Sequence, residues 1–115
     1  CPGHTPGSVV LLDESRKMLF AGDSVAEGPT YLFMSECSIR SFAAGLQKLQ
    51  RYAEKIEHIY PSHRNMDLDV SYIAELAGCA NGIIDGSIRG EGTCIFRPYT
   101  HCKTYRYGRC AIYYH

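Results

Sequence analysis

The chain has 115 residues, of which 45% are hydrophobic and 21% charged, a composition that predicts one folded domain and argues against disorder. Lysine and arginine together number 12, as do aspartate and glutamate, and this zero net charge argues against a dedicated nucleic-acid binder. No apolar run approaches the ~20 residues that a transmembrane helix needs, so we expect neither a nucleic-acid nor a membrane partner.

The first eight residues, Cys1-Pro2-Gly3-His4-Thr5-Pro6-Gly7-Ser8, are the most distinctive chemically, and the chain begins with cysteine rather than methionine. We therefore expect it to be a piece of a longer protein. Residues 9–12 are apolar and partly β-branched, which predicts a strand buried on both faces. Residues 17–23 predict a second strand that ends on Gly-Asp, and a turn at 15–16 makes the two a hairpin.

Hydrophobic residues recur at helical spacing from residue 38 to residue 56, with most of the charged residues off this stripe, which predicts an amphipathic helix. A short strand is predicted over residues 58–60, before Pro61 and a polar loop. A second helix is predicted from a cap at Asp69 to about Ile84, although Gly78 and Gly82 lower its helical propensity.

The tail from Thr93 alternates β-favouring segments with Pro98 and Gly108, which predicts two or three antiparallel strands. Cys94, Cys102 and Cys110 recur there every eight residues, with His101 beside the second of them. Zinc modules pair ligands about two to four residues apart, and no Cys-x-x-Cys occurs in this chain. The pattern therefore favours buried thiols on successive strands over a structural zinc site.

The other three cysteines, Cys1, Cys37 and Cys79, lie in or beside segments that predict turns and helices. Six cysteines could form three disulfides, but this chain does not resemble a short secreted disulfide scaffold. We therefore expect reduced thiols and a cytoplasmic protein.

Three polar residues stand where a strand or turn ends and a loop begins: His4, Asp23 and His63. Imidazole and carboxylate are ligands that divalent cations accept, and loops at strand ends can bring them to one ion. Taken singly, each residue is more readily explained as an ordinary loop side chain. Their joint appearance in this order is what suggests a metal site.

Four features follow one another along the chain: Pro-Gly-His-Thr-Pro-Gly-Ser before an apolar strand, Leu-Phe-Ala-Gly-Asp-Ser, an amphipathic helix, and Ile-Tyr-Pro-Ser-His. In this order they resemble the C-terminal half of the metallo-β-lactamase fold hydrolase superfamily. The resemblance runs from residue 2 to about residue 64 and continues more loosely to the end. It implies an α/β (α+β) fold, the second half of an αββα sandwich, with a mostly antiparallel sheet and two flanking helices. Residues 1–115 are then expected to be the C-terminal half of one such domain, with no second domain.

The resemblance also implies a site for two divalent ions, most often zinc, with iron or manganese as alternatives. Such a site activates a water for attack on an ester, thioester, amide or phosphoester, as in thioesterase-like members such as glyoxalase II. On this resemblance, His4 is a ligand of the first metal, Asp23 is the catalytic carboxylate that bridges both metals, and His63 is a ligand of the second. The expected substrate is a small molecule.

Two features depart from the family pattern. The His-x-His-x-Asp-His motif, which supplies the remaining ligands, is absent from these residues. We expect it in a missing N-terminal half of the domain, so the fragment alone is expected to be inactive. The alternative is a catalytically inactive truncated chain or a partner-binding scaffold.

The second departure is Arg64, where similar members carry glycine. Its cation could bind an anionic substrate group, but extension of the side chain into solvent is favoured.

Overall fold

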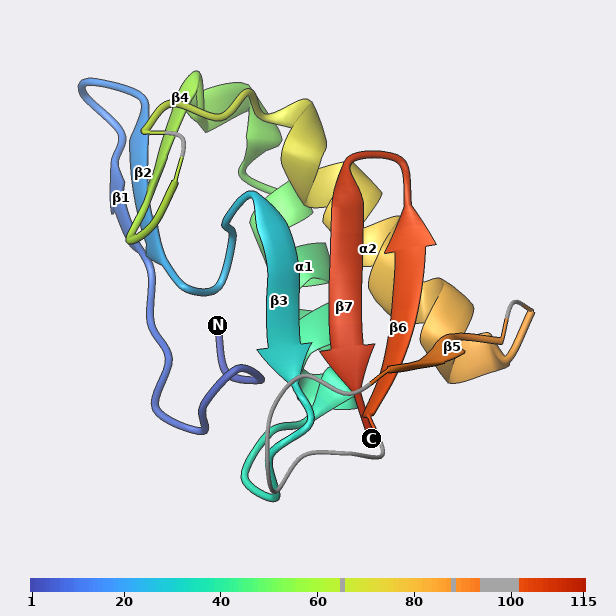
Figure 1. Ribbon diagram of the computed structural model, residues 1–115. Helices are drawn as coiled ribbons and strands as arrows, with labels where there is room; N and C mark the ends of the chain where they lie inside the picture. The colour runs from blue at the N-terminus through green and yellow to red at the C-terminus, as the bar shows by residue number, and fades with distance from the viewer. Residues whose placement is uncertain (65, 88, 94–101) are drawn as a thin grey trace.

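The computed structural model describes residues 1–64, 66–87, 89–93 and 102–115. The elements follow in the order β1 (Leu11–Asp13), β2 (Met18–Gly22), β3 (Gly28–Leu32), α1 (Ile39–Gln50), the 3-10 helix η1 (Ala53–Lys55), β4 (His58–Pro61), α2 (Ser71–Asp85), β5 (Glu91–Thr93), β6 (Cys102–Tyr107) and β7 (Cys110–Tyr114). They form a three-stranded sheet, β1-β2-β4, and a four-stranded sheet, β3-β7-β6-β5 (Figure 1). The predicted mixture of helices and mostly antiparallel strands is confirmed, and the strands form two sheets.

The three-stranded sheet contains the predicted hairpin. Strands β1 and β2 are antiparallel, with Leu12 opposite Leu19, and β4 runs parallel to β2, with Ile59 on the other side of Leu19. Since parallel strands end at the same edge of a sheet, the loops after β2 and β4 lie side by side. The Ser62 amide donates to the Gly22 carbonyl at 3.0 Å, which fixes the two loops to each other.

The predicted burial of the first strand on both faces is wrong. Strand β1 begins only at Leu11, and the side chains of Val9 and Leu11 are 71% and 67% exposed. Leu11 pairs with Phe20 and Phe20 with Tyr60, so these three residues form a row across one face of the sheet. The Phe20 and Tyr60 rings stack at 5.8 Å. Leu11 and Phe20 are exposed and Tyr60 is half-buried; we call these three residues the exposed row.

Helix α1 begins after Ser38, whose hydroxyl accepts a hydrogen bond from the Ser41 amide. It ends at Gln50, earlier than the predicted stripe, and η1 leads to Ile56, which is still buried. Its buried face joins residues of the three-stranded sheet in one hydrophobic core; the buried residues of α1 are Phe42, Ala43, Leu46 and Leu49.

Helix α2 packs against α1 and against strands β6 and β7, and both helices lie behind the four-stranded sheet in Figure 1. Its first turn follows Val70, while the predicted cap Asp69 lies one residue earlier and accepts from the Ser71 amide. Gly82 faces the tip of Tyr105, and a methyl group there would come within 2.8 Å of the Tyr105 hydroxyl. The glycines that weaken the helix by propensity therefore let it approach the sheet closely.

Strand β3 was not predicted, and it pairs in parallel with β7, with Thr30 opposite Ile112. The antiparallel order of β5, β6 and β7 agrees with the prediction for the tail. Cys102 and Cys110 are buried on neighbouring strands as expected, whereas Cys94, Pro98 and His101 lie outside the described residues. In the described part of the chain, no helix is both long enough and apolar enough to cross a membrane.

Candidate metal site

The three predicted site residues meet in one groove of about 330 Å³. His4 comes from the first loop, Asp23 follows β2, and His63 follows β4. Arg64 and Glu27 also line this groove, and β3 provides its remaining wall. The parallel pairing of β2 with β4 explains why Asp23 and His63, far apart in sequence, lie close together.

The Asp23 carboxylate presents one oxygen to each histidine. His4 Nε2 lies 3.7 Å from Asp23 Oδ2, and His63 Nε2 lies 3.3 Å from Asp23 Oδ1. Zinc binds histidine nitrogen and carboxylate oxygen at about 2.0–2.2 Å, so two ligands of one tetrahedral ion are separated by about 3.4 Å. Each nitrogen–oxygen pair therefore has a separation that suits two ligands of a common cation.

The arrangement consists of two pairs that share Asp23, not of three ligands around one point. Across residues 1–64, 66–87, 89–93 and 102–115, no group of three or more His, Cys, Asp or Glu side chains is close enough to hold a metal ion. A closed site would thus need ligands beyond these three.

The ring of His4 is oriented by the backbone of β3. Its Nδ1–H donates to the Tyr31 carbonyl at 2.9 Å, which leaves the Nε2 lone pair facing Asp23 in the neutral ring. The Cys37 thiol in turn donates to the His4 carbonyl at 3.0 Å. Sequence reasoning missed Tyr31 and Cys37 because a backbone acceptor leaves no trace in residue type and both are distant in sequence.

The loop that carries His4 is also fixed to the start of α1. The Gly3 carbonyl accepts from the Ser38 amide at 2.9 Å. Gly3 has a φ of 145°, and a methyl group there would lie only 2.4 Å from Cβ of Phe42. The backbone next to His4 can approach the helix this closely only because residue 3 has no side chain.

The groove is open toward solvent on the His63 side. The His63 side chain is 72% exposed, whereas that of His4 is 20% exposed. Arg64 has a left-handed φ of 66°, and a methyl group on Gly28 would come within 2.6 Å of its Nη1. The guanidinium therefore lies against the Gly28 backbone at the start of β3.

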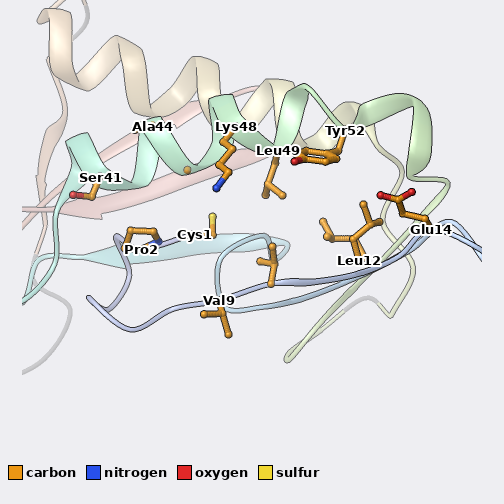
Figure 2. Close-up of a pocket in the computed structure, with 13 residues that line it drawn as sticks. Cys1, Pro2, Val9, Leu12, Glu14, Ser41, Ala44, Lys48, Leu49 and Tyr52 are labelled. Atoms are coloured by element: carbon orange, nitrogen blue, oxygen red, sulfur yellow. The ribbon is translucent and has the colours of Figure 1, made fainter.

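A larger groove of about 670 Å³ lies elsewhere, between the start of the chain, β1 and α1 (Figure 2). Apolar residues such as Val9, Leu12 and Leu49 form much of its wall, and Lys48 extends into it from α1. Among the described residues that line it, there is neither a histidine nor an aspartate. The imidazoles and the aspartate that could hold a metal ion line the smaller groove.

The chain thus combines a mixed α+β fold with a groove in which the imidazoles of His4 and His63 lie beside the Asp23 carboxylate. The family model of the metallo-beta-lactamase superfamily matches residues 1–63, which is more than half of the chain. The chain belongs to this superfamily, and its two sheets and two helices are consistent with part of that fold.

The chain is also similar to proteins named acyl-coenzyme A thioesterase MBLAC2. It is 31% identical to the Gallus gallus protein over 67 residues, and 32% identical to the Bos taurus and Homo sapiens proteins over 66 residues. Each match covers 56% of this chain and 24% of the relative. The chain thus spans about a quarter of the length of the curated relatives it matches.

Proposed function

We propose that the complete protein is a metal-dependent hydrolase that cleaves acyl thioesters, and that this chain is the C-terminal half of its catalytic domain. Membership of the superfamily supports a hydrolase, and the thioesterase names of the relatives favour a thioester over an amide or phosphoester. The observation that carries the proposal is the Asp23 carboxylate with one imidazole beside each of its oxygens.

In this proposal His4, Asp23 and His63 would hold two ions, with one histidine for each ion and Asp23 as the carboxylate that they share. Each ion then has two ligands from this chain, and zinc in proteins takes about four ligands, so residues of the missing N-terminal half complete the set. Two divalent cations, zinc first and iron or manganese as alternatives, would lower the pKa of a bound water toward neutrality and so supply a hydroxide for attack on the thioester.

The residues of this chain position the reaction. Asp23 fixes the two imidazoles relative to each other, and the Tyr31 carbonyl keeps the His4 Nε2 lone pair directed at the site. The buried side of the groove at His4 limits water, and the open side at His63 admits the small-molecule substrate.

The same N-terminal half is the proposed partner of the exposed row. Leu11, Phe20 and Tyr60 form an apolar surface across all three strands of the sheet. A sheet with an apolar face normally buries that face against another layer. The segment that supplies the remaining ligands is therefore proposed to cover this row.

Substitution in the complete protein tests the proposal. His4→Ala, Asp23→Ala and His63→Ala should each abolish hydrolysis of an acyl-coenzyme A and reduce the bound metal, measured by a thiol-release assay and by elemental analysis. His58→Ala is the matched control, since His58 contacts Asp67 at 3.0 Å and does not line the groove. Full activity of Asp23→Ala would show that the carboxylate does not bridge the ions.

The chain by itself gives a second readout. Equilibrium dialysis should detect only weak zinc binding by residues 1–115, lost in Asp23→Ala, because the ligand set is incomplete. Tight, stoichiometric zinc binding would contradict the shared site.

The alternative is an inactive, partner-binding scaffold, which the exposed row favours because it offers an apolar surface for association. A complete protein with neither metal nor thioesterase activity would support the scaffold.

A further inference from the structure

Arg64 occupies a position that its backbone does not favour. Its φ of 66° lies in the left-handed region, where a residue with a side chain is strained by about 1–2 kcal/mol relative to glycine. Strain of this kind clusters at functional sites, where the surrounding structure holds the residue in place. The observation calls for a role that glycine could not fill.

Arg64 is exposed to solvent, but its side chain lines the candidate site. Together with His4, Asp23 and His63, it lines the groove of about 330 Å³, and its guanidinium rests against Gly28. Gly28 has a φ of 87°, and any side chain there would displace the guanidinium. Arg64, in the loop after β4, and Gly28, the first residue of β3, both have left-handed backbones, and together they place this cation at the groove.

The hydrogen-bonding capacity of the Arg64 guanidinium is unused among the described residues. Within the part of the chain that the structure describes, Arg64 makes neither a hydrogen bond nor an ion pair, although Glu27 and Asp23 line the same groove. Guanidinium groups bind carboxylates and phosphates through paired N–H donors, which remain available here. Of the described residues that line the groove, Arg64 is the only lysine or arginine.

We propose that Arg64 binds a carboxylate on the acyl part of the substrate, so that the site accepts short acyl groups that end in a carboxylate. The proposal rests on the proposed hydrolase function for the nature of the reacting group, but the anion site itself rests only on the groove.

The position of Arg64 selects the acyl group as the source of the anion. Arg64 directly follows His63, and the whole groove is at the small end of the range for ligand pockets. A bound anion therefore lies close to the reacting carbonyl. The phosphates of an acyl-coenzyme A are separated from its thioester by the whole pantetheine arm, so they cannot reach Arg64 while the carbonyl is at the site.

Anion binding by the metal-free chain, treated with a chelator, tests the inference without any turnover. Succinate should shift the amide signals of Gly28 and Arg64 in a ¹H–¹⁵N NMR titration, and the neutral analogue succinamide should not. Arg64→Gln should weaken succinate binding about tenfold or more, because hydrogen bonds to a charged partner are lost. Arg64→Lys should retain part of the affinity.

Two further variants separate the charge effect from a folding defect. Glu27→Gln should tighten succinate binding, because Glu27 lines the groove and repels an anion. Arg40→Gln is the matched control: Arg40 is an exposed residue of α1 outside the groove, and its loss should leave the affinity unchanged.

Equal affinity of the parent chain and Arg64→Gln would overturn the inference. Binding of inorganic phosphate without binding of succinate would overturn the choice of a carboxylate. Since neither metal nor hydrolysis enters the titration, a failure of the proposed function would leave the anion result unaffected, and the reverse also holds.

Discussion

Gly3 is the residue at which the first loop meets α1, and it provides a sharp stability test. Gly3→Ala would place a methyl group within 2.4–2.7 Å of Phe42 backbone and Cβ atoms, so we expect a loss of about 1–3 kcal/mol in the free energy of unfolding. Gly7→Ala is the control, because no atom lies within 4 Å of the added methyl group. Urea denaturation followed by circular dichroism measures both, and equal midpoints would contradict the close contact.

The left-handed backbone of Arg64 makes a second prediction at the same scale. Arg64→Gly and Arg64→Ala both remove the guanidinium, but only glycine relieves the strain at a φ of 66°. We expect Arg64→Gly to be more stable than Arg64→Ala by about 1 kcal/mol in thermal or urea unfolding. A glycine variant no more stable than the alanine variant would show that residue 64 leaves the left-handed region.

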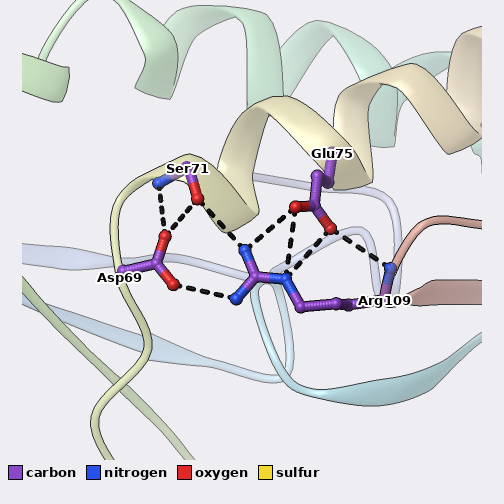
Figure 3. A network of polar contacts seen from close by, with 4 residues as sticks. All are labelled: Asp69, Ser71, Glu75 and Arg109. Atoms are coloured by element: carbon purple, nitrogen blue, oxygen red, sulfur yellow. Dashed lines mark hydrogen bonds and ion pairs between the residues drawn. The ribbon is translucent and has the colours of Figure 1, made fainter.

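Strands and helices are joined at one point by a network around Arg109, in the turn between β6 and β7 (Figure 3). Its guanidinium donates to Asp69 Oδ2 at 2.8 Å, to both oxygens of Glu75 and to the Ser71 hydroxyl at 3.1 Å. It also lies 5.2 Å from the centre of the Tyr72 ring. The network connects this turn to the first turns of α2.

The network makes stability depend on acidic pH. Hydrogen bonds from Arg109 and Ser71 hold the pKa of Asp69 at about 2, and Arg109 lowers the pKa of Glu75. A carboxyl group with a lowered pKa stabilises the fold above its unfolded pKa, and this contribution is lost as the pH falls from about 4 to about 2. Because both carboxylates are partly exposed, the effect is modest.

Arg109→Gln should therefore lower stability at pH 7 and reduce its decline between pH 4 and pH 2, measured by urea midpoints across that range. Part of the decline should remain, since Ser15 and Arg16 also hold the pKa of Asp13 at about 2. Arg106→Gln, at an exposed position of β6, is the control. An unchanged pH profile in Arg109→Gln would show that the network does not couple to folding.

Elements with a local signal were predictable from the sequence, and those set by distant pairing were not. The stripe of α1 and the Ser15-Arg16 turn of the hairpin depend on neighbours a few residues away. Strand β3 begins with Gly28-Pro29, residues typical of turns, and becomes a strand because β7 pairs with it. The burial expected for Val9 and Leu11 failed because hydrophobicity does not say whether a covering layer is present.

The candidate site shows the same division. His4, Asp23 and His63 could be identified as candidate metal ligands from their residue type and position in the sequence, and the structure brings them into one groove. The contact that orients the His4 ring could not be predicted, because its acceptor is the main-chain carbonyl of Tyr31 and does not depend on the residue type there.

Across the whole molecule, the reactivity of the cysteine thiols depends on how deeply each one is buried. Cys1, Cys37, Cys79, Cys102 and Cys110 are all thiols rather than disulfides. Burial raises the pKa of Cys79 to about 12 and that of Cys110 to about 11, so neither forms the reactive thiolate near neutral pH.

Alkylation of the folded chain at pH 8, mapped by peptide mass spectrometry, should therefore modify Cys1 well before Cys79 and Cys110. In urea the three should react at similar rates, which controls for local sequence effects. Rapid modification of Cys79 or Cys110 without denaturant would contradict the packing of α2 on the four-stranded sheet.

The parallel pairing of β3 with β7 determines when the first loop can reach its final structure during synthesis. A nascent polypeptide leaves the ribosome from its first residue, so β3 emerges long before β7, the last strand in Figure 1. The Tyr31 carbonyl that orients His4 gains its fixed place only when that last strand arrives. A premature stop codon shortly before Cys110 would leave every groove residue encoded and still release the histidine from its orientation.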